Sequence, residues 1–218
     1  MTIQQRLAEI QVRIAAACTK SLRGQAVELL AVSKTHGADA VREAIVVGQM
    51  VFAENRVQEA MEKFPVLREA YPDMRLHLIG MLQTNKVRDA VALFDAVHAI
   101  DRQAIAAKLA NEMQKQNRNL TCFIQVNTGA EPQKAGVMIA DLPELLRFCR
   151  EDAGLGIKGL MCIPPLAEDP SPHFKLLAEL ADEYQLLLLS MGMSADFETA
   201  IRLGATHVRV GSSIFGER

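Results

Sequence analysis

Two short runs of small and hydroxyl-bearing residues near the end of the chain have the composition of an anion-binding site. The first run is Ser190-Met191-Gly192-Met193-Ser194, and the second is Gly211-Ser212-Ser213. Each run follows an apolar, strand-like segment. Accessible backbone N–H groups near a helix N-terminus bind phosphate. The two runs therefore predict a phosphate cup formed by Ser190, Gly192, Met193, Ser194, Gly211 and Ser212.

The first run also has a purely structural interpretation. Ser194 is a good N-cap for a helix from Ala195 to Leu203, and Gly204 is a good residue to end that helix. A cap explains Ser194, but it requires neither Gly192 nor Ser190. Both interpretations stay open from the sequence alone.

Lys34 ends the apolar run Leu29-Leu30-Ala31-Val32-Ser33, at the carboxyl end of the first predicted strand. In a barrel of parallel strands, that end lies on the same rim as the phosphate cup. An amine that is partly removed from water reaches its neutral, nucleophilic form more easily and can form an imine. A lysine and a phosphate cup at one barrel mouth suggest pyridoxal 5′-phosphate (PLP) held as a Schiff base. The alternative is a solvated surface lysine whose stem packs on apolar neighbours.

Arg209 lies between Val208 and Val210 in the last predicted strand and points to the opposite face from both. A guanidinium there needs an acceptor, which is either a carboxylate in a structural ion pair or the ring nitrogen of the cofactor. Because arginine keeps its protons, a ring nitrogen facing it would stay unprotonated and make the ring a weak electron sink. Asn55 and His77 are polar residues in or beside the second and third strands, and are either core residues or part of the site.

Strand-like apolar runs alternate with segments of helical periodicity along the whole chain. Eight such runs predict a closed parallel barrel, and residues 1–218 are expected to form a single domain, a (β/α)8 TIM barrel. An extra N-terminal helix is predicted from Ile3, Leu7, Ile10 and Ile14, which share one face. The strand-like runs are Val27–Ser33, Met50–Ala53, Leu76–Gly80, Ala96–Ile100, Cys122–Asn127, Ile157–Ile163, Gln185–Ser190 and His207–Gly211.

A doubly wound open sheet is the alternative architecture. The turn after the first strand reads Ser33-Lys34-Thr35-His36-Gly37 and lacks the Gly-x-Gly-x-x-Gly pattern that such folds use for dinucleotides. This difference favours the barrel.

Composition limits the possible partners and the compartment. The formal net charge is −2, and 23% of the residues are charged, so no basic footprint for nucleic acid is present. The four cysteines form no Cys-x-x-Cys pair and lie in apolar surroundings, which is typical of a reducing cytoplasm. No uncharged run is long enough to cross a bilayer, and the histidines lack metal-ligand spacing. We therefore expect a soluble cytoplasmic protein with no membrane anchor and no metal.

Seven ordered blocks of the chain resemble the pyridoxal phosphate homeostasis proteins, which are single-domain relatives of the barrel half of alanine racemase. The resemblance runs from about Leu29 to the end of the chain. The blocks are Ala31-Val32-Ser33-Lys34-Thr35, Glu54-Asn55-Arg56-Val57-Gln58-Glu59, His77-Leu78-Ile79-Gly80 with Leu82-Gln83-Thr84-Asn85-Lys86, Gln125-Val126-Asn127 with Glu131-Pro132-Gln133-Lys134-Ala135-Gly136-Val137, Gly159-Leu160-Met161-Cys162-Ile163, Ser190 to Phe197, and Arg209 to Gly216.

The resemblance implies a role for each candidate residue. Lys34 would carry PLP as a Schiff base, and Arg209 would face the ring nitrogen. Asn55 and His77 would line the ring pocket, with Met161 also among the cofactor-binding residues. The phosphate would lie against Ser190, Gly192, Met193, Ser194, Gly211 and Ser212.

The resemblance further implies a protein of PLP homeostasis that stores the cofactor or delivers it to apo-enzymes that use PLP. We expect a monomer without turnover of its own. The alternative is a PLP-dependent racemase or decarboxylase of weak activity. A two-base racemase needs a second acid or base opposite the lysine, and the two tyrosines, Tyr71 and Tyr184, are both predicted at the other end of the barrel.

Overall fold

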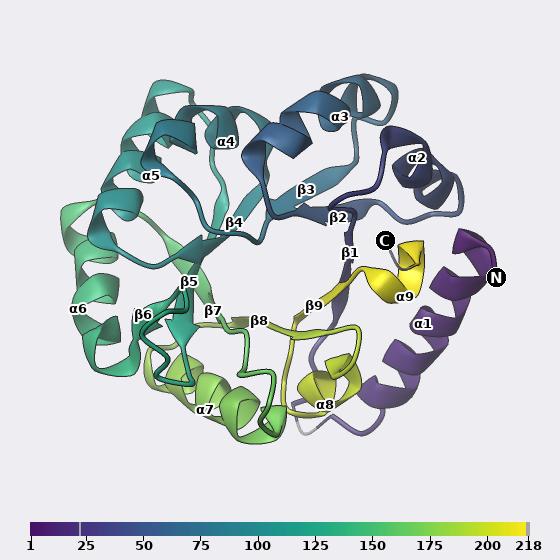
Figure 1. Cartoon of the computed structure of the whole chain (residues 1–218). Helices are drawn as coiled ribbons and strands as arrows, with labels where there is room; N and C mark the ends of the chain where they lie inside the picture. The colour runs from purple at the N-terminus through teal and green to yellow at the C-terminus, as the bar shows by residue number, and fades with distance from the viewer. Residues whose placement is uncertain (22, 217–218) are drawn as a thin grey trace.

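Eight parallel strands close into a barrel in the computed structural model, which describes residues 1–21 and 23–216 (Figure 1). The strand order is β4-β3-β2-β1-β9-β8-β7-β5, and pairing of β4 with β5 closes the ring. The predicted barrel is thereby confirmed, and the open sheet is excluded. The strands of the ring are β1 (Glu28–Val32), β2 (Val51–Glu54), β3 (Arg75–Leu78), β4 (Ala96–Ile100), β5 (Thr121–Asn127), β7 (Ile157–Met161), β8 (Leu188–Met193) and β9 (His207–Val210).

Two details of the strands differ from the sequence prediction. A ninth strand of two residues, β6 (Val137–Met138), pairs with the end of β5 outside the ring. The seventh strand of the ring, β8, continues to Met193 instead of ending at Ser190. Its pairing with β9 shifts register between Ser190 and Met193, and such an irregularity changes the direction of the side chains that follow it.

Helices surround the barrel, and the N-terminal helix completes their ring. Among the described residues, the last strand is followed by the four-residue helix α9, so one position in the ring would otherwise stay open. Helix α1 packs against α8, α2 and α9 and covers that position (Figure 1). The predicted extra helix thus lies beside the barrel. The helices are α1 (Ile3–Cys18), α2 (Ala38–Val46), α3 (Val57–Ala70), α4 (Val87–Leu93), α5 (Gln103–Lys115), α6 (Leu142–Arg147), α7 (Pro170–Glu183), α8 (Phe197–Arg202) and α9 (Ser212–Phe215).

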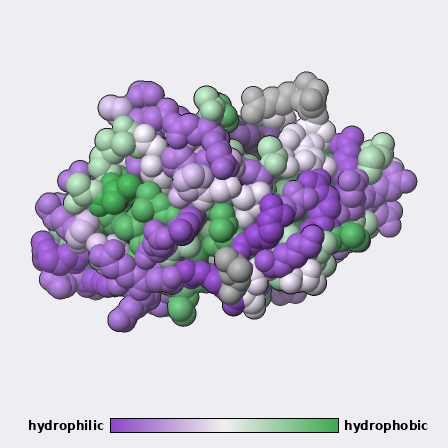
Figure 2. Space-filling view, turned by 90° about the horizontal axis from the view of Figure 1, so that it is seen from below, coloured by the Kyte–Doolittle hydropathy of each residue, from purple (hydrophilic) through white to green (hydrophobic). Residues whose placement is uncertain are grey.

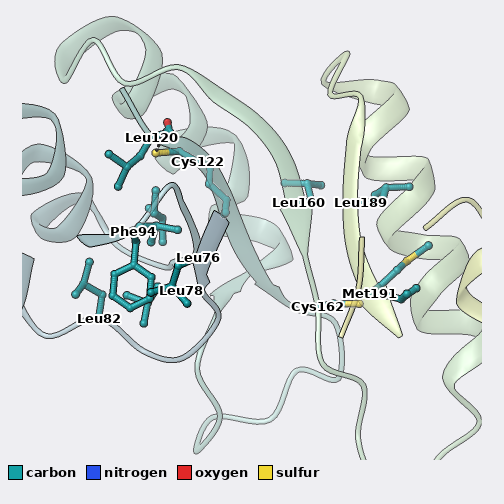
Figure 3. Close-up of a cluster of buried hydrophobic side chains, with 14 of the residues drawn as sticks. Leu76, Leu78, Leu82, Phe94, Leu120, Cys122, Leu160, Cys162, Leu189 and Met191 are labelled. Carbon is teal, nitrogen blue, oxygen red and sulfur yellow. Dashed lines mark hydrogen bonds between the residues drawn. The ribbon is translucent and has the colours of Figure 1, made fainter. Parts of the chain in front are cut away.

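The main hydrophobic core lies between the strands and the helices, because alternate residues of each strand face outward. Figure 3 shows part of it, with Leu76 and Leu78 near Phe94 on one side and Leu189 and Met191 on the other. Inside the barrel, two smaller apolar clusters flank polar side chains. One cluster is Leu30, Val32, Val51, Ala53 and Ile79, and the other is Ala99, Phe123 and Met161.

The outer surface is largely polar on the side that α7 and α8 cover, and the apolar residues exposed there gather mainly in the left half of the view in Figure 2. Three cysteines, Cys122, Cys149 and Cys162, are buried, and the four cysteines of the chain are free thiols. Within the described ranges, no helix combines the length and apolar character needed to cross a membrane.

Substitution at one glycine tests the packing between neighbouring barrel strands. A Cβ at Gly159 in β7 would lie 2.2 Å from the Leu188 carbonyl oxygen of β8. Gly159→Ala should therefore lower the free energy of unfolding by roughly 1 to 3 kcal/mol or more, as overpacking does. Urea unfolding measures the change. Gly156→Ala is the matched control, because a Cβ there meets no atom within 4 Å; equal stability of the two variants would contradict this strand geometry.

Candidate functional site

A cavity of about 690 Å³ opens at the carboxyl ends of the barrel strands. Seven of the predicted site residues line it, and they come from the ends of β1, β2, β8 and β9 and from the connections that follow these four strands. In a parallel barrel these connections converge on one face, although they are far apart in sequence. The seven residues are Lys34, Asn55, Met193, Ser194, Arg209, Gly211 and Ser212.

Lys34 follows β1 by two residues, on a turn whose other residues are tied to buried charges. Lys63 of α3 donates from its ammonium to the carbonyl oxygens of Ser33 (2.8 Å) and His36 (2.9 Å). The Ser33 hydroxyl donates to the carboxylate of Glu54 (2.6 Å). Lys34 itself is one of the residues that line the cavity.

Asn55 follows β2 and lines the same cavity, where the backbone of the next strand approaches it closely. A Cβ at Gly80 would lie 2.1 Å from the Asn55 carbonyl oxygen. Only glycine permits this approach, so Gly80 fixes where the loop after β3 passes Asn55.

The two loops of the predicted phosphate cup are joined by one hydroxyl. Ser194 Oγ accepts hydrogen bonds from the Gly211 backbone N–H and the Ser212 hydroxyl, each at 3.3 Å. The alternative of Ser194 as a helix cap is wrong, because α8 begins at Phe197 and Asp196 precedes it. The Asp196 carboxylate instead accepts from the Met193 N–H at 2.6 Å.

Gly192 has a structural reason that differs from the predicted one. Its φ is +91°, and a Cβ there would lie 2.6 Å from the Ala200 Cβ and 2.9 Å from the Phe197 Cα. Both neighbours belong to α8. Gly192 is therefore required for close packing of the loop on this helix, and it does not line the cavity.

Arg209 is only 3% exposed and reaches the cavity from inside the barrel. Its guanidinium donates to the Ser190 hydroxyl (2.7 Å) and to the Cys162 carbonyl oxygen (2.8 Å). Among the described residues, no carboxylate forms an ion pair with it, so the structural ion pair considered from sequence is absent. A buried cation with only neutral acceptors is well placed to receive a ligand that is anionic or rich in acceptors.

A hydrogen-bonded chain continues from Arg209 along the barrel axis. Ser190 Oγ lies 2.8 Å from His98 Nδ1, and His98 Nε2 lies 3.1 Å from His77 Nδ1. Because arginine only donates, Ser190 accepts from it, and its own buried proton is satisfied by donation to His98. His98 then carries its proton on Nε2 and donates to His77. The chain thus has one direction, away from the cavity.

Three predicted site residues lie deeper in the barrel than expected. His77 is absent from the wall of this cavity and borders a second cavity at the N-terminal mouth instead. Successive inward residues of one strand occupy successive layers, so Ile79 meets the upper cavity and His77 lies one layer below. Ser190 and Met161 are fully buried and are also absent from the cavity wall; Met161 packs near Phe123.

The donor set of the upper cavity suits an anionic ligand that reacts with an amine. Its described wall contains Lys34, Arg209, two serine hydroxyls and the Gly211 backbone, and no aspartate or glutamate. Charge-assisted hydrogen bonds to a phosphate are strong in such a setting. In the described part of the chain, no group of three or more His, Cys, Asp or Glu side chains could hold a metal ion.

Sequence reasoning missed Lys63, Glu54 and His98. Lys63 occupies a helical position where a surface charge is the usual expectation, yet its side chain is 8% exposed. Glu54 is a charged residue in an otherwise apolar strand-like run, and His98 lies in the middle of another such run, Ala96–Ile100. The signal that could have identified Glu54 and His98 is a charged or polar residue within an apolar, strand-like run. Lys63 carried no such signal, because it lies on a helix.

Comparison with known proteins gives full-length matches. A model of the family described as alanine racemase, N-terminal domain, matches residues 6–218. A pyridoxal phosphate homeostasis protein of Aquifex aeolicus is 40% identical over 228 residues, covering 100% of this chain and 99% of that relative. The protein of the same description from Escherichia coli K12 is 38% identical, with coverage of 99% and 97%.

Solved structures agree with this result. PipY of Synechococcus elongatus PCC7942, determined with PLP bound, is 36% identical with a TM-score of 0.85, and the match covers 99% of this chain and 100% of PipY. An alanine racemase of Clostridium difficile 630 is 14% identical with a TM-score of 0.70, and this chain covers 56% of it. The latter similarity concerns the fold alone.

Buried histidines should make the folded state sensitive to acid. Burial lowers the pKa of His77 to about 3 and of His207 to about 4, and it lowers the pKa of His98 well below its usual range. Below pH 6.5 the unfolded chain binds protons that these folded histidines do not, so stability falls as the pH drops. Each histidine should contribute about 1.4 kcal/mol per pH unit between pH 6 and 5.

Urea unfolding of the cofactor-free protein at several pH values between 7 and 5 measures this dependence. Burial raises the pKa of Glu54, so the folded protein takes up at most one extra proton there as the pH falls. This uptake offsets part of the loss of stability that the histidines cause. His207→Gln, at the N-terminal mouth, should reduce the slope by about 1.4 kcal/mol per pH unit. A slope that this variant leaves unchanged would show that His207 already titrates in the folded state.

Proposed function

Because the chain belongs to the alanine racemase N-terminal domain family, with full-length relatives named pyridoxal phosphate homeostasis proteins, we propose that it binds PLP in the cavity at the carboxyl ends of its barrel strands. One observation carries the proposal. Lys34 and the buried Arg209 border one cavity whose described wall has no carboxylate.

Each wall residue has a part in holding this ligand. PLP supplies an aldehyde, which condenses with a primary amine to form a C=N bond with release of one water. Lys34 supplies that amine. The Ser194 hydroxyl donates to the phosphate, and the Gly211 N–H and the Ser212 hydroxyl exchange their 3.3 Å hydrogen bonds to Ser194 Oγ for phosphate oxygens when the ligand binds.

Arg209 and Asn55 complete the proposed ring pocket. Arg209 donates to the ring nitrogen and holds it unprotonated, because its guanidinium does not release a proton. Ser190 and Cys162 support this orientation by accepting its other N–H groups. Asn55 borders the ring from the end of β2.

We favour storage and delivery of PLP over turnover of an amino acid. Tyr71 and Tyr184 end α3 and α7, so both precede barrel strands and lie at the N-terminal end, away from Lys34. His36 does border the cavity, but it shares the turn of Lys34 and so lies on the same side. An unprotonated ring also weakens the electron sink that racemases and decarboxylases use. The proposal therefore describes a cytoplasmic monomer, a single binding domain over residues 1–218, that passes PLP to apo-enzymes.

Reduction with borohydride tests the residue that carries the cofactor. After loading with PLP, the label should be fixed on the peptide that contains Lys34. Lys34→Ala should lose the covalent link and keep weaker binding, because charge-assisted hydrogen bonds of about 1.5 to 3 kcal/mol each remain in the cup. Absorbance spectra and peptide mapping measure both effects.

Two other lysines near this rim serve as controls. Lys134 is paired with Glu131 at 2.6 Å, and Lys86 borders a separate, smaller pocket. Lys86→Ala and Lys134→Ala should leave the label in place. A label found mainly on either lysine would move the covalent site away from Lys34.

Transfer and turnover are separated by two assays of the loaded protein. Mixing it with a PLP-dependent apo-enzyme should restore activity of that enzyme, while mixing it with L- or D-alanine should give little or no racemisation. Racemisation with a kcat on the order of 10 per second would identify an enzyme instead. Lys34→Ala loaded with the same amount of PLP is the control for transfer from the covalent site.

A further inference from the structure

A buried ionic cluster lies directly beneath the turn that carries Lys34. Lys63 Nζ is 2.7 Å from Glu54 Oε1 and 3.3 Å from Glu59 Oε1. The Lys63 side chain is 8% exposed and that of Glu54 is fully buried. Burying such charges carries a large desolvation cost, and apolar residues of similar size are often as stable. The cluster therefore suggests a role beyond stability.

The cluster binds three of the four residues of the turn. The Lys63 ammonium donates to the Ser33 and His36 carbonyl oxygens, and it donates its third proton to the Glu54 carboxylate. The Thr35 backbone N–H donates to the Glu59 carboxylate.

Thr35 shows that the turn is held in a costly conformation. Its φ is +69°, in the left-handed region that a β-branched residue rarely adopts. Such a conformation persists only where the surrounding contacts enforce it. Here Glu59 accepts a hydrogen bond from the Thr35 N–H, and Lys63 donates to the carbonyl oxygens of Ser33 and His36.

We propose that Lys63 is a positioning residue, which fixes the Ser33–His36 turn so that the Lys34 amine faces the cavity. This inference rests on the proposed function, because it assigns Lys63 to the formation of the covalent link. Misplacing a reacting group by about 1 Å costs on the order of 100-fold in rate. Loss of Lys63 should therefore slow the reaction of Lys34 more than it weakens phosphate binding in the cup.

The test compares variants of the full chain at a temperature where all are folded. Lys63→Met removes the three donors and keeps the stem, and the double variant Lys63→Met/Glu54→Gln avoids leaving a lone buried carboxylate. Arg68→Met is the matched control, because Arg68 lies on the same helix and loses an ion pair with Asp95 (2.6 Å) away from the turn.

Two measurements are made on each variant. Stopped-flow absorbance after mixing with PLP gives the rate of covalent attachment, which should fall about 10-fold or more in both Lys63 variants and stay unchanged in Arg68→Met. Backbone amide exchange of Thr35 and His36, measured without cofactor, should accelerate in the same variants. Equal attachment rates in wild type, Lys63→Met and the double variant would overturn the inference.

The two measurements also separate this inference from the proposed function. If wild type forms no covalent link at Lys34, the proposed function is wrong, and unchanged amide exchange in the Lys63 variants would then overturn the positioning role as well. Should both Lys63 variants fail to fold, Glu59→Ala decides, because Glu59 is partly exposed and binds the Thr35 N–H. This variant should also slow attachment and accelerate amide exchange at Thr35, and no change in either would overturn the inference.

Discussion

The interior of this barrel is organised around one buried guanidinium. Arg209 is almost fully removed from water and has neutral acceptors only among the described residues. A charge in that position needs fixed dipoles around it, and Ser190 and the Cys162 carbonyl supply them. The direction of the Ser190 hydroxyl then determines which ring nitrogen of His98 carries the proton. A single cation thus orders polar groups through the length of the barrel.

The polar axis divides the interior into parts with different chemistry. Burial lowers the pKa values of the histidines below Arg209, so these side chains stay neutral at neutral pH. The cavity above Arg209 has cationic and hydroxyl donors and no carboxylate on its described wall. The mouth below is bordered by two neutral histidines and by the carboxylates of Glu28 and Asp95, and the one cation of its described wall, Arg75, is paired with Glu28. Binding of an anion is therefore favoured at the carboxyl end of the strands and not at the opposite mouth.

Closure of the barrel joins two halves of the site that fold from opposite ends of the chain. Lys34 follows the first strand, and the phosphate cup follows the last two, yet β1 pairs directly with β9. Separate contacts position the two halves. An ionic cluster holds the turn that carries Lys34, and the Ser194 hydroxyl joins the two loops of the predicted phosphate cup. A ligand with an aldehyde and a phosphate at opposite ends matches this division. Under the proposed function, one lysine in the cavity and an arginine at the ring nitrogen of the cofactor would suit a carrier better than a racemase.

The sequence alone determined the barrel, the end of the barrel that carries the candidate site, and seven of the residues that line its cavity. Alternating strand and helix patterns set the topology, and a residue directly after a parallel strand must lie on the active rim, as Lys34 and Asn55 do. The sequence did not show how deep inside the barrel each inward-facing side chain lies. His77, Ser190 and Met161 lie below the cavity because strand tilt and register set the layer of each inward side chain. The reason for Gly192 was equally hidden, since it depends on how closely α8 packs against β8. Only the tertiary structure placed Lys63 beneath Lys34, because a contact between a helix and a distant turn exists only after the chain has folded.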